Sequence, residues 1–377
     1  MPADFKIETL EAYARLNAAG GRLKVYETYG NLNPSPMASG RAVGSPRLPR
    51  ADMSTLSEYL RASAALGIEF NYTFNAPCTG GMEFSTAGRR RLLDFFEGLV
   101  EAGVRCFTLV TPSLISLVKT QFPHVSVATS TICEIESVAA AKAYAGFGAD
   151  RIIMSEDAHR RFDLLRRVRG SVGRPIELLV NSTCLYLCPW KPFHYNLLSH
   201  MKAAHQPDIE AYYHWQCMAV RASRPIELVK LRWIRPEDLN LYEDATFFKV
   251  VGRYFAQDSD LVRVARTYME GHFDGNLWDL LGNFAPQRRH GFYIDNRALD
   301  GFVEWFARDP RRCRDLACDD CAHCREYAER AVRTPSGLVR ESLGLDELAA
   351  RLERFHRHGA GIQGPGVEEI AVDAGWR

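Results

Sequence analysis

Three cysteines lie just beyond a buried, strand-like run at Ile176–Val180. Cys184 and Cys188 are four residues apart, and Cys217 follows a segment rich in aromatic residues. Thiolates select zinc or iron–sulfur clusters over hard cations, so this spacing predicts a soft-metal site. Histidine is the other ligand of such sites, and the segment also contains His194, His200, His205 and His214. The alternative is that the cysteines are small buried hydrophobes, the commonest role of free cysteine.

A second cysteine set lies in the run Arg312–Tyr327 (RCRDLACDDCAHCREY). Its spacing is C-x4-C-x2-C-x2-C, and its members are Cys313, Cys318, Cys321 and Cys324. Cysteines separated by two residues, repeated in succession, resemble the ferredoxin arrangement. Zinc also accepts four thiolates, and His323 could replace one of them. The run therefore predicts a metal centre, either an iron–sulfur cluster or a structural zinc.

The overall composition is that of a globular chain with no strong electrostatic field. The 377 residues include 47 basic and 46 acidic side chains, a net charge of +1. Binding to nucleic acid depends on neutralising phosphates, so no nucleic-acid partner is expected. No apolar run reaches the roughly 18–20 residues that span a bilayer, and the N-terminus is charged and amphipathic. We expect a cytoplasmic protein whose ten cysteines do not form disulfides, and the seven that fall into the two sets favour metal or redox chemistry.

Strand-like and helix-like segments alternate along the chain. The expected strands are Leu23–Thr28, Ile68–Phe74, Cys106–Val110, Val125–Thr129, Arg151–Met154 and Ile176–Val180, followed by Pro225–Trp233 and Phe247–Val251. Strands that alternate with helices of ten or more residues pair in parallel. The order predicts an α/β fold, a TIM-type (β/α)8-like barrel over residues 1–282, with a cysteine-rich C-terminal extension over residues 283–377.

This fold would bring several cysteines together. In such barrels the chemistry lies on the loops after the strands, at the C-terminal face. Cys78 follows the second expected strand, Cys133 the fourth, and Cys184 and Cys188 the sixth. These four thiols are therefore expected at one mouth. Cys106 opens its strand at the opposite end and is expected in the core.

Arginines and a lysine are candidates for binding and catalysis at this mouth. The loop from residue 29 to residue 52 carries Arg41 and Arg47, which either clamp an anionic substrate or lie solvated on the surface. Arg253 follows the last expected strand, on which Lys249 lies. The planar guanidinium of Arg253 either binds a carboxylate or phosphate, or forms a structural ion pair.

Ring-bearing side chains crowd the segment between Cys188 and Cys217. Trp190, Tyr195 and Tyr213 either stack on a ring-shaped substrate or pack the loops. His194 lies among them and is the third candidate for catalysis, beside Arg253 and Lys249.

Several of these segments, in this order, resemble a known family. The run Ala149–Ser155 (ADRIIMS), the cysteine-bearing loop after the sixth strand and the run Lys249–Tyr268 (KVVGRYFAQDSDLVRVARTY) are similar to those of the collagenase-like peptidase family, the thirty-second of the class of unknown mechanism. The resemblance covers roughly residues 20–275. It implies a TIM-like barrel that holds a 4Fe–4S cluster. Several members are oxygen-independent hydroxylases of ubiquinone precursors, tRNA or ribosomal RNA, and the peptidase label is doubtful for many.

The resemblance also implies some of the ligands. Cys184 and Cys217 match family cluster cysteines, whereas Cys188 has no clean counterpart. Asn196 lies near the position of another family cysteine, and Asn240 stands where some members place a ligand. Val251 replaces the acidic residue of the family's Glu-Gly-Arg motif. The fourth cluster ligand therefore stays open, with Cys78 and Cys133 as the candidates.

The favoured function is an iron–sulfur enzyme for oxygen-independent hydroxylation, or a related redox modification, of a small molecule in a biosynthetic pathway. An electron donor or a homologous partner subunit would assist it. A metal-dependent hydrolase or peptidase is a second hypothesis, although neither H-E-x-x-H nor G-x-S-x-G occurs. A non-catalytic iron–sulfur subunit for electron transfer or scaffolding in a hetero-complex is a third.

Overall fold

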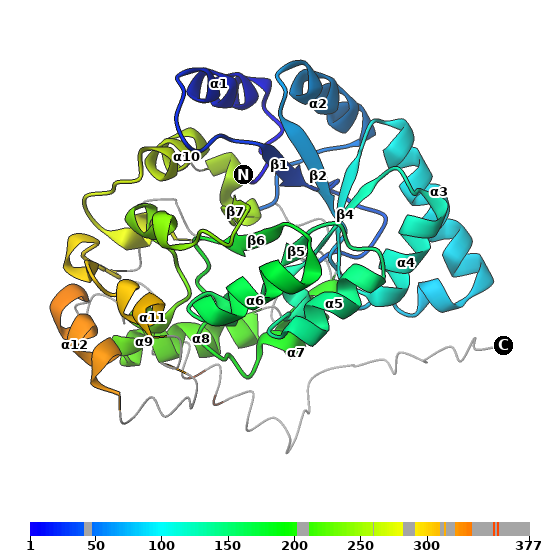
Figure 1. Cartoon of the computed structure of the whole chain (residues 1–377). Helices are drawn as coiled ribbons and strands as arrows, with labels where there is room; N and C mark the ends of the chain where they lie inside the picture. The colour runs from blue at the N-terminus through cyan, green and yellow to red at the C-terminus, as the bar shows by residue number, and fades with distance from the viewer. Residues whose placement is uncertain are drawn as a thin grey trace.

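The computed structural model describes residues 1–40, 47–201, 211–258, 260–281, 291–309, 313, 321–333, 350 and 353. Short strands occupy the middle of the molecule, and helices surround them (Figure 1). The strands are β1 (Glu27–Gly30), β2 (Glu69–Thr73), β3 (Cys106–Leu109), β4 (Ser126–Thr129), β5 (Ile152–Ile153), β6 (Ile176–Leu179) and β7 (Phe247–Lys249). The helices are α1 (Ile7–Ala18), α2 (Met53–Ala65), α3 (Thr86–Glu101), α4 (Pro112–Gln121), α5 (Val138–Gly146), α6 (Phe162–Val172), α7 (Lys191–His200), α8 (Ala211–Ser223), α9 (Ile226–Lys230), α10 (Leu261–Glu270), α11 (Glu304–Arg308) and α12 (Ala322–Ala331). None of these described helices is long and apolar enough to cross a bilayer.

Side-chain caps fix where the outer helices begin. Asp52 accepts a hydrogen bond from the Thr55 amide at the start of α2, and Ser85 and Ser137 cap α3 and α5 in the same way. Such caps satisfy amide groups that have no partner in the first turn of a helix. At the end of α6, Gly173 adopts the left-handed conformation (φ 64°), which glycine tolerates without steric cost. Among the described residues, one α-helix lies between each pair of successive strands from β1 to β6.

The strands pair in parallel, as the alternation predicts. β1–β2–β3–β4 form one sheet and β5–β6–β7 a second, and a parallel bridge between Ala128 and Arg151 connects β4 to the start of β5. Beside β1 lie the first residues of the chain, with the Ala3 amide 2.9 Å from the Tyr29 carbonyl. Within the described residues, no ladder between β7 and β1 closes the ring. The parallel α/β class is confirmed, whereas a closed eight-stranded barrel is not established.

The run Pro225–Trp233 was expected as a strand and contains helix α9 instead. Glu227 and Lys230 are one helical turn apart and form a buried ion pair of 3.3 Å. A short apolar run suits a buried helix as well as a strand, so its pattern alone does not separate the two. The first strand is also displaced: the sequence predicts Leu23–Thr28, whereas β1 begins at Glu27.

The described part of the C-terminal segment shares the core of the preceding chain. The rings of Trp233 and Phe302 lie 5.4 Å apart, and α12 packs against α9. Phe306 and Cys324 belong to the same apolar core. The division predicted at residue 282 stays a prediction, because residues 282–290 and most of the second cysteine run lie outside the described residues.

Buried side chains of the strands form a charged layer near their amino ends. Arg151 contacts Glu27 and Glu177, each at 2.8 Å. Lys249 lies 3.2 Å from Glu177. Burial opposes a charged carboxylate, but Lys249 and Arg151 outweigh it and hold the pKa of Glu177 below its ordinary value. A small apolar cluster follows along the strands, formed by Ala128, Ile153, Leu179 and Val251. The ends of the strands beyond it are polar again.

Candidate functional site

In the first cysteine set, Cys184 and Cys188 lie on the loop after β6, and Cys217 lies on α8. Burial raises the pKa of the Cys184 thiol to about 12 and also raises that of Cys188. Cys188 interacts electrostatically with both Cys184 and Cys217, so the three thiols form one neighbourhood. Between them, Leu187 has a left-handed backbone (φ 48°), and its amide donates to Asp157 at 3.1 Å. A strained non-glycine residue held by a carboxylate indicates a loop fixed in one shape.

A buried ion cluster lies beside these thiols. The Lys191 ammonium, at the start of α7, is 2.7 Å from Asp157 and 3.7 Å from Glu156. All three side chains are at most 7% exposed. Burial disfavours the cation, but Glu156 and Asp157 outweigh it and raise the pKa of Lys191. Ser182 donates its hydroxyl to Glu156 at 2.9 Å. The cluster places a fixed cation, two carboxylates and a hydroxyl at the carboxyl ends of β5 and β6.

Arg221 brings a second buried cation to the same place. It comes from α8 and is 5% exposed. Its guanidinium donates to the Thr183 carbonyl and lies 3.0 Å from the Met218 sulfur. Its Nε has no hydrogen-bond partner among the described residues. Arg221 and Lys191 both act electrostatically on Cys184 and favour its thiolate form.

A row of amides surrounds Arg253 at the ends of β1, β2 and β7. The guanidinium donates to Asn31 at 2.6 Å and to Asn75 at 3.4 Å, and Arg253 is 7% exposed. Nearby, Asn181 follows β6 and bonds the Val251 amide (2.6 Å) and carbonyl (3.0 Å). The sequence places Arg253 at this edge correctly, but it gave no signal for the asparagines beyond their position after strands.

The side chains of two candidates, Lys249 and Cys133, contact groups that do not belong to the candidate site. Lys249 belongs to the charged layer near the amino ends of the strands, where it pairs with Glu177 and lies 4.1 Å from the Tyr29 ring centre. Lys249 is the last residue of β7, whereas Arg253 lies beyond the strand at the start of a 3-10 helix, so the two side chains have different neighbours. The Cys133 thiol faces the carbonyls of Leu109 (3.8 Å) and Val110 (3.4 Å), and burial raises its pKa to about 12.

The remaining candidates are spread over the same end of the molecule. The Cys78 sulfur accepts from the Gly80 amide at 3.4 Å in the loop after β2. His194 stacks on Tyr195 with ring centres 6.1 Å apart, and Tyr213 lies 5.6 Å from it. The Tyr195 hydroxyl is 3.9 Å from the Cys184 sulfur. Trp190 is partly exposed, Arg47 is exposed, and Arg41 lies outside the described residues.

Cys106, expected in the core, is buried near the amino ends of the strands, as predicted. Its sulfur lies 3.2 Å from the Asn71 amide and 4.0 Å from Arg151. Burial raises the pKa of this thiol above its ordinary value. Sequence reasoning missed Glu156, Asp157 and Lys191; the available signal was a run of charges directly after β5.

The second cysteine set is described at Cys313, Cys321 and Cys324, whereas Cys318 lies outside the described residues. Burial raises the pKa of Cys324 to about 11. His323, considered as a substitute ligand, stacks on Trp305 with ring centres 4.1 Å apart, and its Nε2 is 3.1 Å from the Phe302 carbonyl. Across the described parts of the chain, no three Cys, His, Asp or Glu side chains are gathered closely enough to hold a metal ion.

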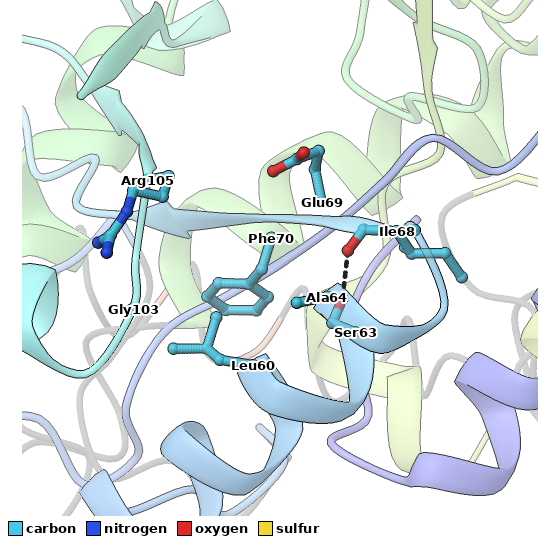
Figure 2. Close-up of a pocket in the computed structure, with 9 residues that line it drawn as sticks. Leu60, Ser63, Ala64, Ile68, Glu69, Phe70, Gly103 and Arg105 are labelled. Carbon is cyan, nitrogen blue, oxygen red and sulfur yellow. Dashed lines mark hydrogen bonds between the residues drawn. The ribbon is translucent and has the colours of Figure 1, made fainter. Parts of the chain in front are cut away.

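A pocket of about 290 Å³ lies at the opposite end of β2. It is lined by Leu60, Ser63, Ala64, Gly67, Ile68, Glu69, Phe70, Gly103 and Arg105. Figure 2 shows these side chains around the start of β2, with the Ser63 hydroxyl donating to the Ile68 carbonyl at 2.6 Å. None of the sequence-predicted residues lines it. The thiols and the buried cations therefore mark the candidate site, and this pocket does not.

Comparison with known proteins agrees with the sequence resemblance. The chain is 31% identical over 301 residues to a protein of Methanocaldococcus jannaschii named "Uncharacterized protease MJ1657", covering 80% of this chain and 87% of that protein. The chain belongs to peptidase family U32. The profile of Peptidase family U32 matches residues 54–201, which run from α2 to the end of α7.

Two solved structures are also similar to this U32 chain. The structure of the U32 peptidase Mk0906 has a TM-score of 0.45 at 16% identity and covers 59% of this chain and 83% of its own. The citrate synthase SbnG has a TM-score of 0.29 at 13% identity, with coverages of 47% and 75%.

Proposed function

We propose that this U32 protein is a cytoplasmic iron–sulfur enzyme that performs an oxygen-independent hydroxylation, or a related redox modification, of a small molecule. Cys184, Cys188 and Cys217 would hold a 4Fe–4S cluster, and Cys78 or Cys133 is the candidate for the fourth ligand. The observation that carries the proposal is the electrostatic interaction of these thiols with one another and with two buried cations at the carboxyl ends of the strands. The described structure does not gather the three thiols around one point, so the cluster would draw them together on binding.

The surroundings of Cys184 fit an anionic metal–thiolate group. The donors are soft sulfurs, which iron–sulfur clusters require. Lys191 and Arg221 lie beside them, and the buried Nε of Arg221 has no partner within the described chain. A buried N–H without a partner costs free energy, so a sulfur or another acceptor at this point would stabilise the fold.

When bound, the cluster would supply electron transfer, and an external donor or a partner subunit would provide the electrons. The chain itself would bind and orient the substrate. Arg253, with its planar guanidinium, would bind a carboxylate or phosphate of the small molecule beside Asn31 and Asn75. Lys191 would stay protonated between Glu156 and Asp157 and so hold a fixed positive charge at the site. His194, Tyr195, Tyr213 and Trp190 would form an aromatic wall.

The test is the iron and acid-labile sulfide content of protein purified without oxygen, together with its visible and EPR spectra. The variants Cys184→Ser and Cys217→Ser should each lose about four iron per chain, one 4Fe–4S cluster. Cys106→Ser is the matched control, because that thiol is also buried but lies near the other end of the strands. Cys78→Ser and Cys133→Ser then separate the two candidates for the fourth ligand. Unchanged iron in Cys184→Ser and Cys217→Ser would sink the proposal.

A peptidase is the second candidate, favoured by the Methanocaldococcus relative, which is named a protease. One geometric observation agrees with it: the Ser182 hydroxyl donates to Glu156, which lies 3.7 Å from Lys191. A hydroxyl bonded to a carboxylate base, with an ammonium beside them, is suited to acyl transfer. Under this hypothesis, cleavage of a fluorogenic peptide library would survive removal of iron and would be abolished in Ser182→Ala. Under the iron–sulfur hypothesis no cleavage is expected.

A further inference from the structure

Arg160 is a buried cation that the proposed function does not use. It follows the turn Glu156–Ala158 after β5 and is 3% exposed. Its guanidinium lies over three aromatic rings, at 4.6 Å from the centre of Phe302, 5.0 Å from Trp233 and 5.3 Å from Phe306. The arrangement is an aromatic box around a positive charge.

The hydrogen bonds of Arg160 are only partly satisfied. Nη2 donates to the carbonyls of Val229 (3.0 Å) and Leu231 (2.7 Å). Nε and Nη1 have no partner among the described residues, and no carboxylate there forms an ion pair with Arg160. A buried charge without an anion, and buried N–H groups without acceptors, each cost free energy. Aromatic faces attract the cation but accept these N–H groups only weakly. Within the described part of the chain, Arg160 therefore lacks an anionic acceptor.

The second cysteine set lies where that acceptor is required. Cys324, near the start of α12, is 9% exposed and packs in the same core as Phe302 and Phe306. Cys324 and Cys313 both interact electrostatically with Arg160. Cys313 and Cys321 in turn interact with Cys324. Apart from these thiols, the groups acting most strongly on Arg160 are Arg232, another cation, and the neutral Tyr242.

We propose that a metal ion or cluster draws Cys313, Cys321 and Cys324 together as ligands of a metal–thiolate centre, and that Arg160 is its buried counter-charge. The described structure does not gather these three thiols around one point, and metal sites commonly form only when the metal binds. Several thiolates around zinc or an iron–sulfur cluster carry net negative charge, and N–H groups directed at the sulfurs stabilise it. Both open N–H groups of Arg160 are suited to this. The His323 side chain packs beside the centre and is not a ligand, because its ring stacks on Trp305 and its Nε2 faces the Phe302 carbonyl. This proposal does not depend on the one made for Cys184, Cys188 and Cys217.

The first experiment locates the centre. The full chain is purified without oxygen as wild type, Cys321→Ser and Cys184→Ser, and iron, zinc and acid-labile sulfide are measured. Cys321 is partly exposed, so its substitution does not threaten folding. Cys321→Ser should lose metal that Cys184→Ser retains. Loss of one zinc identifies a zinc centre, and loss of about four iron with sulfide identifies a cluster. If Cys321→Ser retains all the metal of the wild type, the centre does not exist.

The second experiment tests the counter-charge. The rate of metal release to the chelator 4-(2-pyridylazo)resorcinol is compared in wild type, Arg160→Met and Arg160→Lys. Outer partners of metal ligands typically contribute about 10- to 100-fold in affinity, so Arg160→Met should release the metal at least tenfold faster. Arg160→Lys keeps the positive charge, so its rate of metal release should lie between the rates of the wild type and Arg160→Met. It also replaces Arg160→Met as the test variant if that protein does not fold. Release from Arg160→Lys at the rate of the wild type, with both open N–H groups removed, would overturn the role of Arg160.

Discussion

One short segment, Glu156–Arg160, contributes side chains to the surroundings of both cysteine sets. The buried charges around the two sets are balanced differently. Glu156 and Asp157 face the first set and pair with Lys191. Arg160, at the other end of the segment, lies by the second set with aromatic rings and carbonyls as its partners and with no carboxylate among the described residues. In the first region Lys191 has its own carboxylates, whereas in the second Arg160 has none among the described residues.

This difference separates two roles for a buried charge. A cation paired with carboxylates is stable before anything binds, so it can orient a substrate or move a proton. A cation whose N–H groups lack acceptors is stabilised only when an anionic group arrives, so it favours a resident metal–thiolate centre. Removing Lys191 should therefore destabilise the metal-free fold strongly, whereas removing Arg160 should change its stability little.

The largest expected effect is that of Lys191→Met. The change leaves Glu156 and Asp157 buried without their main cation, and breaking a buried pair costs about 3–5 kcal/mol. The free energy of unfolding, measured by denaturant titration of metal-free protein, should fall by about 3 kcal/mol, since Arg232 at 3.9 Å still partly balances Asp157. Lys142→Met, on the exposed side of α5, is the control and should change little. An equal small change in both variants would mean that the ion cluster is solvated.

The next effect is a pH dependence from His159, which is fully buried between the two regions with its Nδ1 3.1 Å from the Arg232 carbonyl. Burial lowers the pKa of His159 to about 3, whereas the unfolded chain has about 6.5. Between pH 3 and pH 6.5 the unfolded state therefore binds a proton that the folded state does not bind. The contribution of neutral His159 to the free energy of unfolding is complete above pH 6.5 and is lost as the pH falls towards 3.

From pH 7.5 to pH 5 this group should remove about 2 kcal/mol from the free energy of unfolding. His159→Gln cannot titrate, so its stability should fall less than that of the wild type over the same interval. Denaturant titrations at both pH values give the comparison. Parallel losses in the two proteins would show that His159 gains its proton without penalty, against the burial found here.

The smallest effect is expected for Arg160→Met in metal-free protein. No carboxylate of the described chain loses a partner, and the cation–π attraction of about 0.5–2 kcal/mol is offset by removal of a buried charge and two open N–H groups. The free energy of unfolding should change by less than about 1 kcal/mol, in contrast to Lys191→Met. A loss as large as that of Lys191→Met would mean that Arg160 is already balanced without metal, and the contrast between the two regions would disappear.

The sequence predicted the strand–helix alternation well, because caps and apolar runs are local signals. It failed where a local signal suits two structures, as at Pro225–Trp233, whose buried apolar residues form α9. It listed Lys249 with Arg253 as a candidate for catalysis, and the structure pairs the Lys249 ammonium with Glu177. For the site, the thiols were visible in the spacing, whereas Glu156, Asp157 and Lys191 were not.

By itself, the sequence determined the parallel α/β class, the family and the two sets of soft donors, since these depend on residue type and short-range order. The tertiary structure decided which charges meet them. Whether a buried cation is balanced depends on groups far apart in the chain, as Arg160 and Cys324 are, and on the solvent that packing removes. The spacing of residues along the chain encodes neither the distant partners of a buried cation nor its removal from solvent.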